Sequence, residues 1–325
     1  MPHVHVDFHE QGYNNPYYFA PAAEPFHPVI STWQREFQTQ IGKNNAKYFD
    51  ENNWLFFTKE VFDLYYPSYG DTYPTYSGAI GMTYEQGGQR GVSIMTREGV
   101  PLTLEQRLLH HHTTGMSTVE ITSKNAGKVV DEFEKYFKEN LNNPVGTYKS
   151  YIIKADNNPD KITKLTKWMD EHSILLFFFN LSSEDIVVNT YQPKSRFITT
   201  VFEPQSKVPD SLTYDITAWN LFYAYDLKGY ATTERINASK EYQQRVPSNA
   251  PIDTAYAYLF KYETLKDTEF LGELLKQGIK VRAAQKAFKV NGNSFNAGTL
   301  ILTKTNNDHI PNFDKTVQTL ATGYQ

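Results

Sequence analysis

The chain contains no cysteine in its 325 residues. This excludes a thiol nucleophile, a disulfide framework and any zinc or iron–sulfur site built on cysteine. No run of about 18 apolar residues occurs, so the sequence predicts no membrane-spanning helix. Lysine and arginine total 32 against 36 aspartate and glutamate residues, and no basic block is present. Binding of nucleic acid through a basic face is therefore not expected.

The short catalytic motifs are missing as well. None of the nine histidines opens a His-x-x-Glu or a His-Glu-x-x-His sequence, which excludes a self-contained zinc motif. The chain also has no Gly-x-Ser-x-Gly elbow, no phosphate-binding loop and no Gly-x-Gly-x-x-Gly fingerprint. What the chain does have is aromatic residues, with 23 tyrosines and 21 phenylalanines. Tyrosine-rich loops often line wet clefts, and two such loops occupy residues 11–25 and 65–78.

The first part of the chain has clear periodicities. Alternation predicts a strand over residues 2–8, and an apolar run predicts another over 79–85. Helical spacing of large apolar residues predicts a helix over 27–52. The loop 65–78 is too rich in proline and glycine for a helix. These segments predict α/β structure.

Two more helices are expected before a break in the chain. Pro101 stands where a helix over 101–112 would have its first position, and residues 123–141 read as an amphipathic helix. Residues 142–148 then combine proline, glycine and asparagine, which predicts a domain boundary. The predicted domains are therefore 1–143 and 148–325.

The second part reads as another α/β domain. A strand, a helix and a strand follow one another over residues 149–179, which predicts a βαβ unit. The remaining expected elements are a strand over 195–204, a helix over 211–227, a helix and strand over 268–284, and a strand over 294–304.

Candidate chemistry lies at two strand ends. His9 and Glu85 each stand where an apolar strand meets a polar, glycine-containing turn. Ligands in α/β sheets bind beyond the carboxyl ends of strands, so a cleft with one histidine, one glutamate and a tyrosine-rich loop is expected there. The alternative for His9 is a histidine bonded to a main-chain carbonyl, and the alternative for Glu85 is a cap or ion-pair partner. Glu10 is expected to be solvated or bonded within its loop.

Three segments together resemble the carboxypeptidase A-type zinc metallocarboxypeptidases. They are DFHEQGYNNPYYFAP from residue 7, YYPSYGDTYPTYSG from residue 65 and GAIGMTYEQGG from residue 78. They are similar to that family's third-ligand strand end, its flexible tyrosine loop and its strand bearing the catalytic glutamate, in the same order. Residues 148–325 resemble the amidotransferase-like α/β module that follows the peptidase domain in large bacterial members, through SLTYDITAWNL and FNAGTLILT.

The resemblance implies a role for each matched residue. His9 would be a ligand of Zn²⁺, Glu85 the general base, and Tyr66 (or Tyr65) the residue that closes over the substrate's C-terminal residue. Asp7, on the same strand face as His9, would orient the site. The full-length protein would then be a hydrolase that removes C-terminal residues from peptides, and the relatives imply an extracytoplasmic site.

The family's other ligands and its carboxylate-binding residues have no counterpart in these 325 residues. We therefore expect this chain to be the C-terminal part of the peptidase domain, with an incomplete three-layer carboxypeptidase-like mixed sheet. Its expected partner is the missing N-terminal half, and alone it should have little or no activity because catalytic zinc usually needs three protein ligands. Two alternatives remain open: a non-catalytic module that binds peptides or cell-wall material, and a glycan hydrolase that uses Glu85 with a second carboxylate.

One further cluster attracts attention, the histidine run at residues 110–112. Adjacent helical residues point in different directions, so the run does not form a metal site by itself. We expect these histidines at the C-terminal end of a helix, where the helix dipole favours them.

Overall fold

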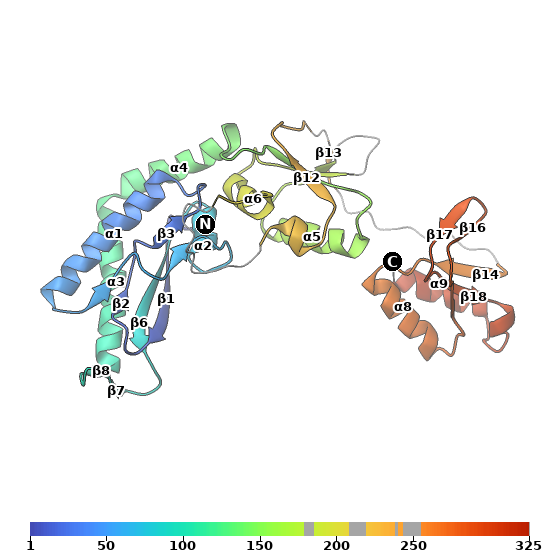
Figure 1. Ribbon diagram of the computed structural model, residues 1–325, viewed down its shortest axis with the longest axis horizontal. Helices are drawn as coiled ribbons and strands as arrows, with labels where there is room; N and C mark the ends of the chain where they lie inside the picture. The colour runs from blue at the N-terminus through green and yellow to red at the C-terminus, as the bar shows by residue number, and fades with distance from the viewer. Residues whose placement is uncertain (179–184, 208–218, 238–239, 243–254, 325) are drawn as a thin grey trace. The chain divides into compact units, whose positions relative to one another are not determined.

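The protein is a mixed α/β molecule with several small sheets (Figure 1). The computed structural model describes residues 1–178, 185–207, 219–237, 240–242 and 255–324. The chain divides into two compact units: unit 1 holds residues 1–155 and 169–241, and unit 2 holds residues 156–168 and 242–325. Unit 1 thus continues beyond the break at 142–148, while the family-based division into 1–143 and 148–325 stays a prediction.

The sheet that positions the candidate site has four strands. They are ordered β1-β6-β2-β4, and their bounds are Val4–Gly12 for β1, Ile80–Gly88 for β6, Tyr17–Tyr18 for β2 and Phe56–Phe57 for β4. β1 runs parallel to β6, whereas β2 is antiparallel to β6 and parallel to β4. The sheet is therefore mixed, and the strands predicted over 2–8 and 79–85 are confirmed.

Three long helices accompany this sheet: α1 (Thr32–Glu51), α3 (Leu104–Lys124) and α4 (Ala126–Asn142). α1 begins at a capping box between Ser31 and Gln34, and α3 begins at one between Thr103 and Gln106. Each box satisfies free amide groups of the first turn. The expectation that Pro101 opens a helix was wrong, because Pro101 lies in the short strand β8 and Thr103 caps the helix instead.

Alternation along β1 and β6 separates two kinds of surface. Ile80, Met82 and Tyr84 belong to a buried cluster with Phe37 and Ile41 of α1, and the valines of β1 pack against that cluster. Because side chains alternate across a strand, the odd-numbered residues of both strands face the other way. The apolar face thus fixes the sheet under α1 and α3, and leaves the opposite face for polar side chains.

Short elements complete this part of unit 1. They are β3 (Ala23–Phe26), β5 (Asp63–Leu64), α2 (Thr72–Tyr76), β7 (Ser93–Met95) and β8 (Pro101–Thr103). The expectation of a helix-free loop over 65–78 was wrong in part, since α2 forms one short helical turn within it. Tyr76 holds this turn by donating its hydroxyl to the carbonyls of Leu64 and Tyr65.

A second sheet of unit 1 has the order β12-β9-β11-β10-β13. Its strands are β9 (Ser150–Ile153), β10 (Phe177–Phe178), β11 (Ile186–Asn189), β12 (Gly229–Thr232) and β13 (Lys240–Glu241). Every pairing in it is antiparallel. The predicted order of strand, helix and strand is present as β9, α5 (Pro159–Glu171) and β10, but β11 lies between the two strands.

The segment expected as a strand over 195–204 is a helix, α6 (Ser195–Phe202). Its β-branched residues from Ile198 to Val201 favour a strand, yet all eight residues of α6 are buried. A helix satisfies its main-chain hydrogen bonds within the segment, which matters when every side is buried. Tertiary context therefore overrides the local preference for a strand. The helix expected over 211–227 is described only in its last part, where α7 covers Leu221–Ala224.

Unit 2 contains a three-stranded sheet of order β14-β18-β15, with bounds Ala257–Phe260, Leu300–Thr303 and Arg282–Ala283. A separate hairpin joins β16 (Phe288–Val290) to β17 (Asn293–Phe295), and η1 spans Thr305–Asn307. The helices α8 (Leu265–Lys276) and α9 (Phe313–Gly323) share a buried cluster with Tyr258 and Leu302 of the sheet. The strand expected over 294–304 is thus two strands. No helix among the described residues is long and apolar enough to cross a membrane.

Candidate functional site

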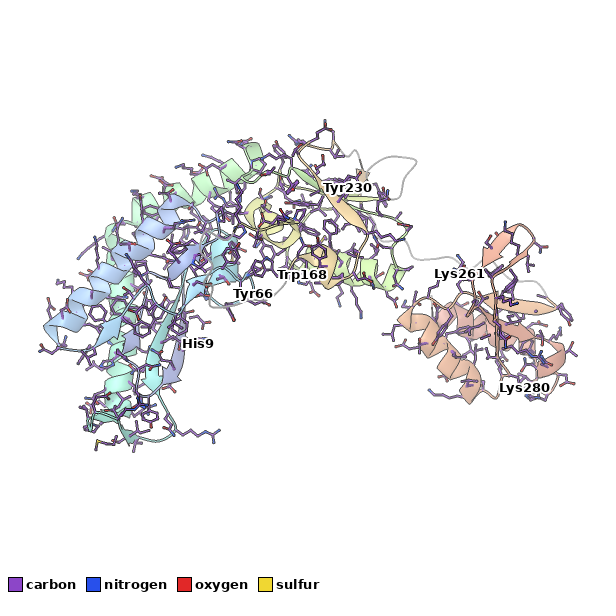
Figure 2. The ribbon with its side chains drawn as sticks, viewed as in Figure 1. His9, Tyr66, Trp168, Tyr230, Lys261 and Lys280 are labelled. Carbon is purple, nitrogen blue, oxygen red and sulfur yellow. The ribbon has the colours of Figure 1, made fainter. Side chains whose placement is uncertain are left out.

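The strand register brings two of the predicted site residues together. His9 of β1 stands directly opposite Glu85 of β6, although 75 residues separate them in the sequence. Their side chains share the odd-numbered face, and His9 Nδ1 lies 4.0 Å from Glu85 Oε1. Both strands run on past this pair, to Gly12 and Gly88, so the expectation that His9 and Glu85 end their strands was wrong. The pair lies in the second half of two adjacent parallel strands and forms the centre of the candidate site; Figure 2 labels His9.

Asp7 orients the imidazole from the same face of β1. Its Oδ2 lies 3.0 Å from His9 Nε2. A carboxylate at one ring nitrogen favours the proton there and leaves the other nitrogen as the acceptor. His9 Nδ1, the nitrogen nearer Glu85, is then the one able to accept a proton or bind a metal ion.

Glu85 is an unusual carboxylate because only 7% of its surface is exposed. Burial raises the pKa of its carboxyl, the imidazole of His9 opposes this, and the carboxylates of Asp7 and Asp71 add to it. A carboxyl group whose pKa moves toward neutrality is suited to accept and return a proton. The main chain of Glu85 is also held, since its carbonyl accepts a hydrogen bond from Gln11 Nε2.

Asp71 is a third carboxylate of this face, and the sequence did not single it out. It is buried at the start of α2, and burial raises its pKa to about 6 against a hydrogen bond from Thr83 that lowers it. The loop before α2 lies tightly against β1 and β6. A Cβ on Gly70 would lie 1.9 Å from Asp7 Oδ2, and one on Gly81 would lie 2.0 Å from the Asp71 carbonyl oxygen. Two glycines therefore permit this close approach.

Tyr66, the predicted substrate-capping residue, is half-buried in the same loop. Its ring packs edge-on against Tyr69 at 5.1 Å and Trp219 at 5.8 Å. Within the described chain, no hydrogen bond or ring contact links Tyr66 to His9 or Glu85. Tyr65 is buried, and its hydroxyl donates to the carbonyl of Lys207. Tyr66 is thus the more accessible of the two candidates.

A cleft of about 580 Å³ adjoins Glu85. Its wall combines the apolar side chains of Phe57, Val61 and Phe62 with the carboxylates of Glu10 and Glu60. Glu10 is also bonded to Arg107 at 3.0 Å, so this half-exposed carboxylate is an ion-pair partner as well. An apolar wall with a few polar groups is typical of a cleft that binds an organic ligand.

The residues present fit part of a metal site. His9 offers a neutral ring nitrogen beside a carboxylate, the arrangement that commonly supports a zinc-bound histidine. Among the described residues, no three histidine, aspartate or glutamate side chains are grouped so that they could hold a metal ion. A catalytic zinc ion would therefore need ligands in addition to His9.

The histidine run does not lie at a helix end, so that expectation was wrong. α3 continues to Lys124, and His110 and His111 face the sheet from its first half. His110 Nδ1 bonds to Gln86 Oε1 at 2.8 Å, and burial lowers its pKa to about 4. His111 Nδ1 bonds to the hydroxyl of Tyr17 at 2.7 Å. Both are packing residues behind the candidate site.

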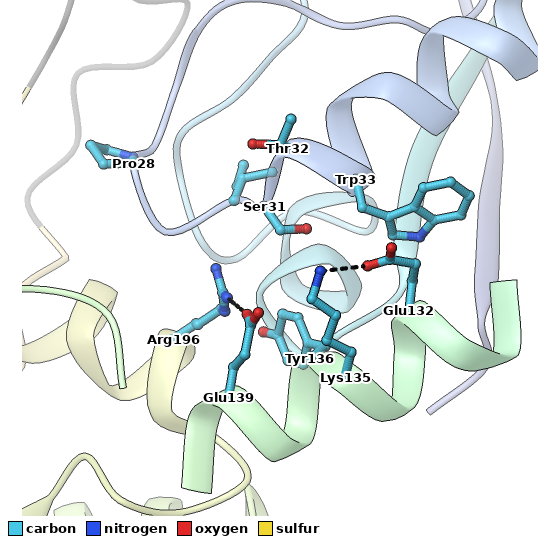
Figure 3. Close-up of a pocket in the computed structure, with 10 residues that line it drawn as sticks. Pro28, Ser31, Thr32, Trp33, Glu132, Lys135, Tyr136, Glu139 and Arg196 are labelled. Atoms are coloured by element: carbon cyan, nitrogen blue, oxygen red, sulfur yellow. Dashed lines mark hydrogen bonds and ion pairs between the residues drawn. The ribbon is translucent and has the colours of Figure 1, made fainter. Parts of the chain in front are cut away.

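A separate pocket of about 310 Å³ lies between the start of α1 and the helices α4 and α6 (Figure 3). Its charges are paired within the wall: Arg196 with Glu139 at 2.9 Å, and Lys135 with Glu132 at 3.4 Å. Arg196 also bonds to Asn140. The two contacts of Arg196 join α6 to α4, and the Lys135–Glu132 pair lies within α4, so the pocket has a structural explanation.

Comparison with known protein families, with curated proteins and with solved structures found no match for this chain. The geometry of the described residues is therefore the basis for a functional proposal.

Proposed function

We propose that this chain carries part of the active site of a zinc metallocarboxypeptidase, with His9 as a zinc ligand and Glu85 as the general base. The observation that carries the proposal is the direct pairing of His9 with Glu85 in adjacent parallel strands, with Asp7 bonded to the imidazole. The resemblance of the three quoted segments to that family supports the same roles.

Each residue has a distinct task in this proposal. A bound zinc ion would supply Lewis-acid polarisation of the scissile carbonyl and of the attacking water. Asp7 holds the proton on His9 Nε2 and so keeps Nδ1 available as a ligand. Glu85 accepts a proton from the attacking water and returns it to the leaving amine, a task that its raised pKa favours. Tyr66 would cover the substrate's C-terminal residue, and the cleft beside Glu85 would receive the peptide.

The missing ligands would come from a second polypeptide segment, the N-terminal half of the peptidase domain. β1 has β6 as its only partner among the described strands, so one edge of a nine-residue strand is open. Ser117 and Glu120 of α3 face α1 through Asn44. Helical periodicity therefore turns Leu108 and Val119, each 61% exposed, to the opposite side.

Phe8 lies between the open edge of β1 and the exposed apolar side of α3. It is 46% exposed and packs against the ring of His111 at 5.1 Å. An open strand edge beside exposed apolar side chains is a surface that proteins normally cover. Covering it would bring a further polypeptide segment next to His9 and Glu85.

Zinc binding by a protein that contains both this chain and the N-terminal half with a His-x-x-Glu pair tests the ligand role. We expect His9→Ala to weaken Zn²⁺ binding at least about tenfold, because it removes the one proposed ligand of this chain. His309→Ala, at an exposed histidine of unit 2, should leave binding unchanged. The measurement is competition with a chromophoric chelator. Equal Zn²⁺ affinity of the His9→Ala variant and the unchanged chain would contradict the ligand role.

Peptide hydrolysis tests the role of Glu85, using a protein that also contains the N-terminal half with a His-x-x-Glu pair. Glu85→Gln should lower the release of the C-terminal residue from an N-blocked dipeptide by about 10²–10⁴, the usual contribution of a general base. Zinc content should not change, and Glu98→Gln on the β7–β8 turn serves as the matched control. Retained turnover in Glu85→Gln would show that another group is the base. Peptide binding without hydrolysis in every variant would favour a binding module.

A further inference from the structure

Among the described strands of unit 2, β14 stands at the edge of its sheet with one side open. β14 pairs with β18, and the Lys304 amide donates to the Tyr256 carbonyl at 3.0 Å. In an antiparallel ladder, main-chain groups point alternately toward the partner and away from it. The N–H and C=O groups of Ala257 and Leu259 therefore point to the open edge. No hydrogen bond from another described residue reaches them.

A groove of about 280 Å³ lies between β14 and the β16–β17 hairpin. Leu259 and Phe260 line it from the sheet, and Val290 and Phe295 line it from the hairpin. Figure 1 shows the hairpin projecting from the body of unit 2. Asn293 adds an amide to this wall. The groove thus offers apolar contacts beside unpaired main-chain donors and acceptors.

Basic residues are frequent in the chain segments that line the groove, although Lys304 among them is paired with Asp314. Residues 277–307 contain four lysines and one arginine and no acidic residue. Lys261 follows β14 directly and is labelled in Figure 2. Lys289 is the middle residue of β16. Both side chains are exposed, and neither forms an ion pair within the described residues. Unit 2 as a whole has 13 lysine and arginine residues against nine aspartate and glutamate residues.

We propose that this groove binds an extended acidic peptide, which adds a strand to the edge of β14. The open main-chain groups of Ala257 and Leu259 would pair with the peptide backbone, as in other cases of strand addition. Alternate apolar side chains of the peptide would enter the groove, and its carboxylates would lie near Lys261 and Lys289. This function goes beyond the proposed hydrolase and does not depend on it.

A peptide fits these features better than a polynucleotide does. Single-stranded nucleic acid binds through stacking of its bases on aromatic side chains in a basic channel. The groove contains the rings of Phe260 and Phe295, but it also holds Leu259 and Val290 beside main-chain groups spaced at every second residue of β14. A strand's own backbone has the matching spacing.

Binding of a labelled peptide to the full chain tests the proposal by fluorescence anisotropy. The probe is an N-acetylated octapeptide of alternating glutamate and valine, compared with its lysine–valine counterpart and with a single-stranded octadeoxynucleotide. We expect the acidic peptide to bind in preference to both. Lys289→Glu should weaken its binding about five- to tenfold, because an attraction becomes a repulsion. Lys315→Glu, at an exposed site of α9, should not weaken it.

Ala257→Pro tests the strand addition itself. It removes an N–H that points to the open edge and leaves the β14–β18 hydrogen bonds in place, a position where strands tolerate proline. We expect a loss of peptide binding of about tenfold with an unchanged circular dichroism spectrum. Unchanged binding in Ala257→Pro would overturn strand addition, and equal binding of acidic and basic peptides would overturn the charge preference. Tighter binding of the oligonucleotide, or equal weakening by Lys315→Glu and Lys289→Glu, would overturn the proposal as a whole; should Ala257→Pro not fold, the lysine variants still decide it.

Discussion

The two faces of the β1–β6 strand pair differ in the side chains they hold. On the even-numbered face, Ile80, Met82 and Tyr84 pack into an apolar cluster beneath α1. On the odd-numbered face, His9 and Glu85 lie near Asp7 and Asp71, and burial disfavours the charged form of Glu85 and Asp71. One face thus stabilises the fold and the other holds partly buried charge at a cost. The same alternation builds both the core and the site. It predicts that substitutions on the apolar face lower the free energy of unfolding much more than substitutions on the polar face.

The largest expected effect is on the apolar face. Phe37 of α1 is fully buried in the cluster, and Phe37→Ala should lower the free energy of unfolding of unit 1 by about 3–5 kcal/mol. Glu85→Gln, on the other face, should cost less than about 1 kcal/mol, because the neutral amide avoids the desolvation of a carboxylate. Urea denaturation followed by tryptophan fluorescence measures both. Similar losses in the two variants would remove the contrast between the faces.

The next effect concerns Asp71 and its pKa, which burial raises from 3.8 to about 6. The folded state then binds this proton more tightly than the unfolded state, so stability is present below pH 4 and is lost as the pH rises to about 6. Asp71→Asn should remove this loss and stabilise the protein at pH 7 by about 2–3 kcal/mol. Unfolding curves at pH 4 and pH 7 provide the measurement, with Asp131→Asn as an exposed control. A variant less stable than the unchanged chain at pH 7 would show that the Asp71 carboxylate is stabilising.

The contribution of His110 to stability should depend on pH in the opposite direction to that of Asp71. Burial lowers the pKa of His110 from 6.5 to about 4, so its contribution to stability is present above pH 6.5 and is lost as the pH falls to about 4. His110→Asn, whose amide can still bond to Gln86, should reduce the acid sensitivity by about 1–2 kcal/mol. His112→Asn, at an exposed neighbour, should not. Thermal unfolding between pH 4 and pH 7 distinguishes them, and equal acid sensitivity in both variants would refute the role of His110.

The smallest expected effect is at Glu10, which follows His9 in β1. Glu10→Gln breaks an ion pair with Arg107, but half of the Glu10 side chain is exposed. Ion pairs that water reaches contribute about 0–1 kcal/mol, so the loss should stay below about 1 kcal/mol. A double-mutant cycle with Arg107→Gln measures the pair, and a coupling energy above about 2 kcal/mol would contradict this prediction.

The sequence predicted the parts of the fold that depend on local periodicity. β1, β6 and α1 appear where alternation or helical spacing placed them, because their patterns match the surfaces they bury. α6 was predicted as a strand, because the run of β-branched residues from Ile198 favours one. Its burial depends on packing against α4, where Arg196 of α6 bonds to Glu139 and Asn140, and no local pattern contains these contacts.

The candidate site was predictable in the same limited way. His9 and Glu85 each follow the apolar part of a strand in the sequence, and the resemblance predicted that they share a site; the strands themselves continue to Gly12 and Gly88. Asp71 had no such signal, since aspartate before a threonine in a loop is common at turns. Its importance arises from burial against β6, which only the folded chain reveals.

The register of β1 against β6 also limits how this protein can change. His9 meets Glu85 because two alternations agree to the residue along nine paired positions. Insertion or deletion of one residue inside β1 would move His9 to the apolar face and place Phe8 or Glu10 opposite Glu85. Descendants of this sequence can therefore exchange many side chains within these strands, but they cannot alter the strands' length between the core and the site without losing the pair.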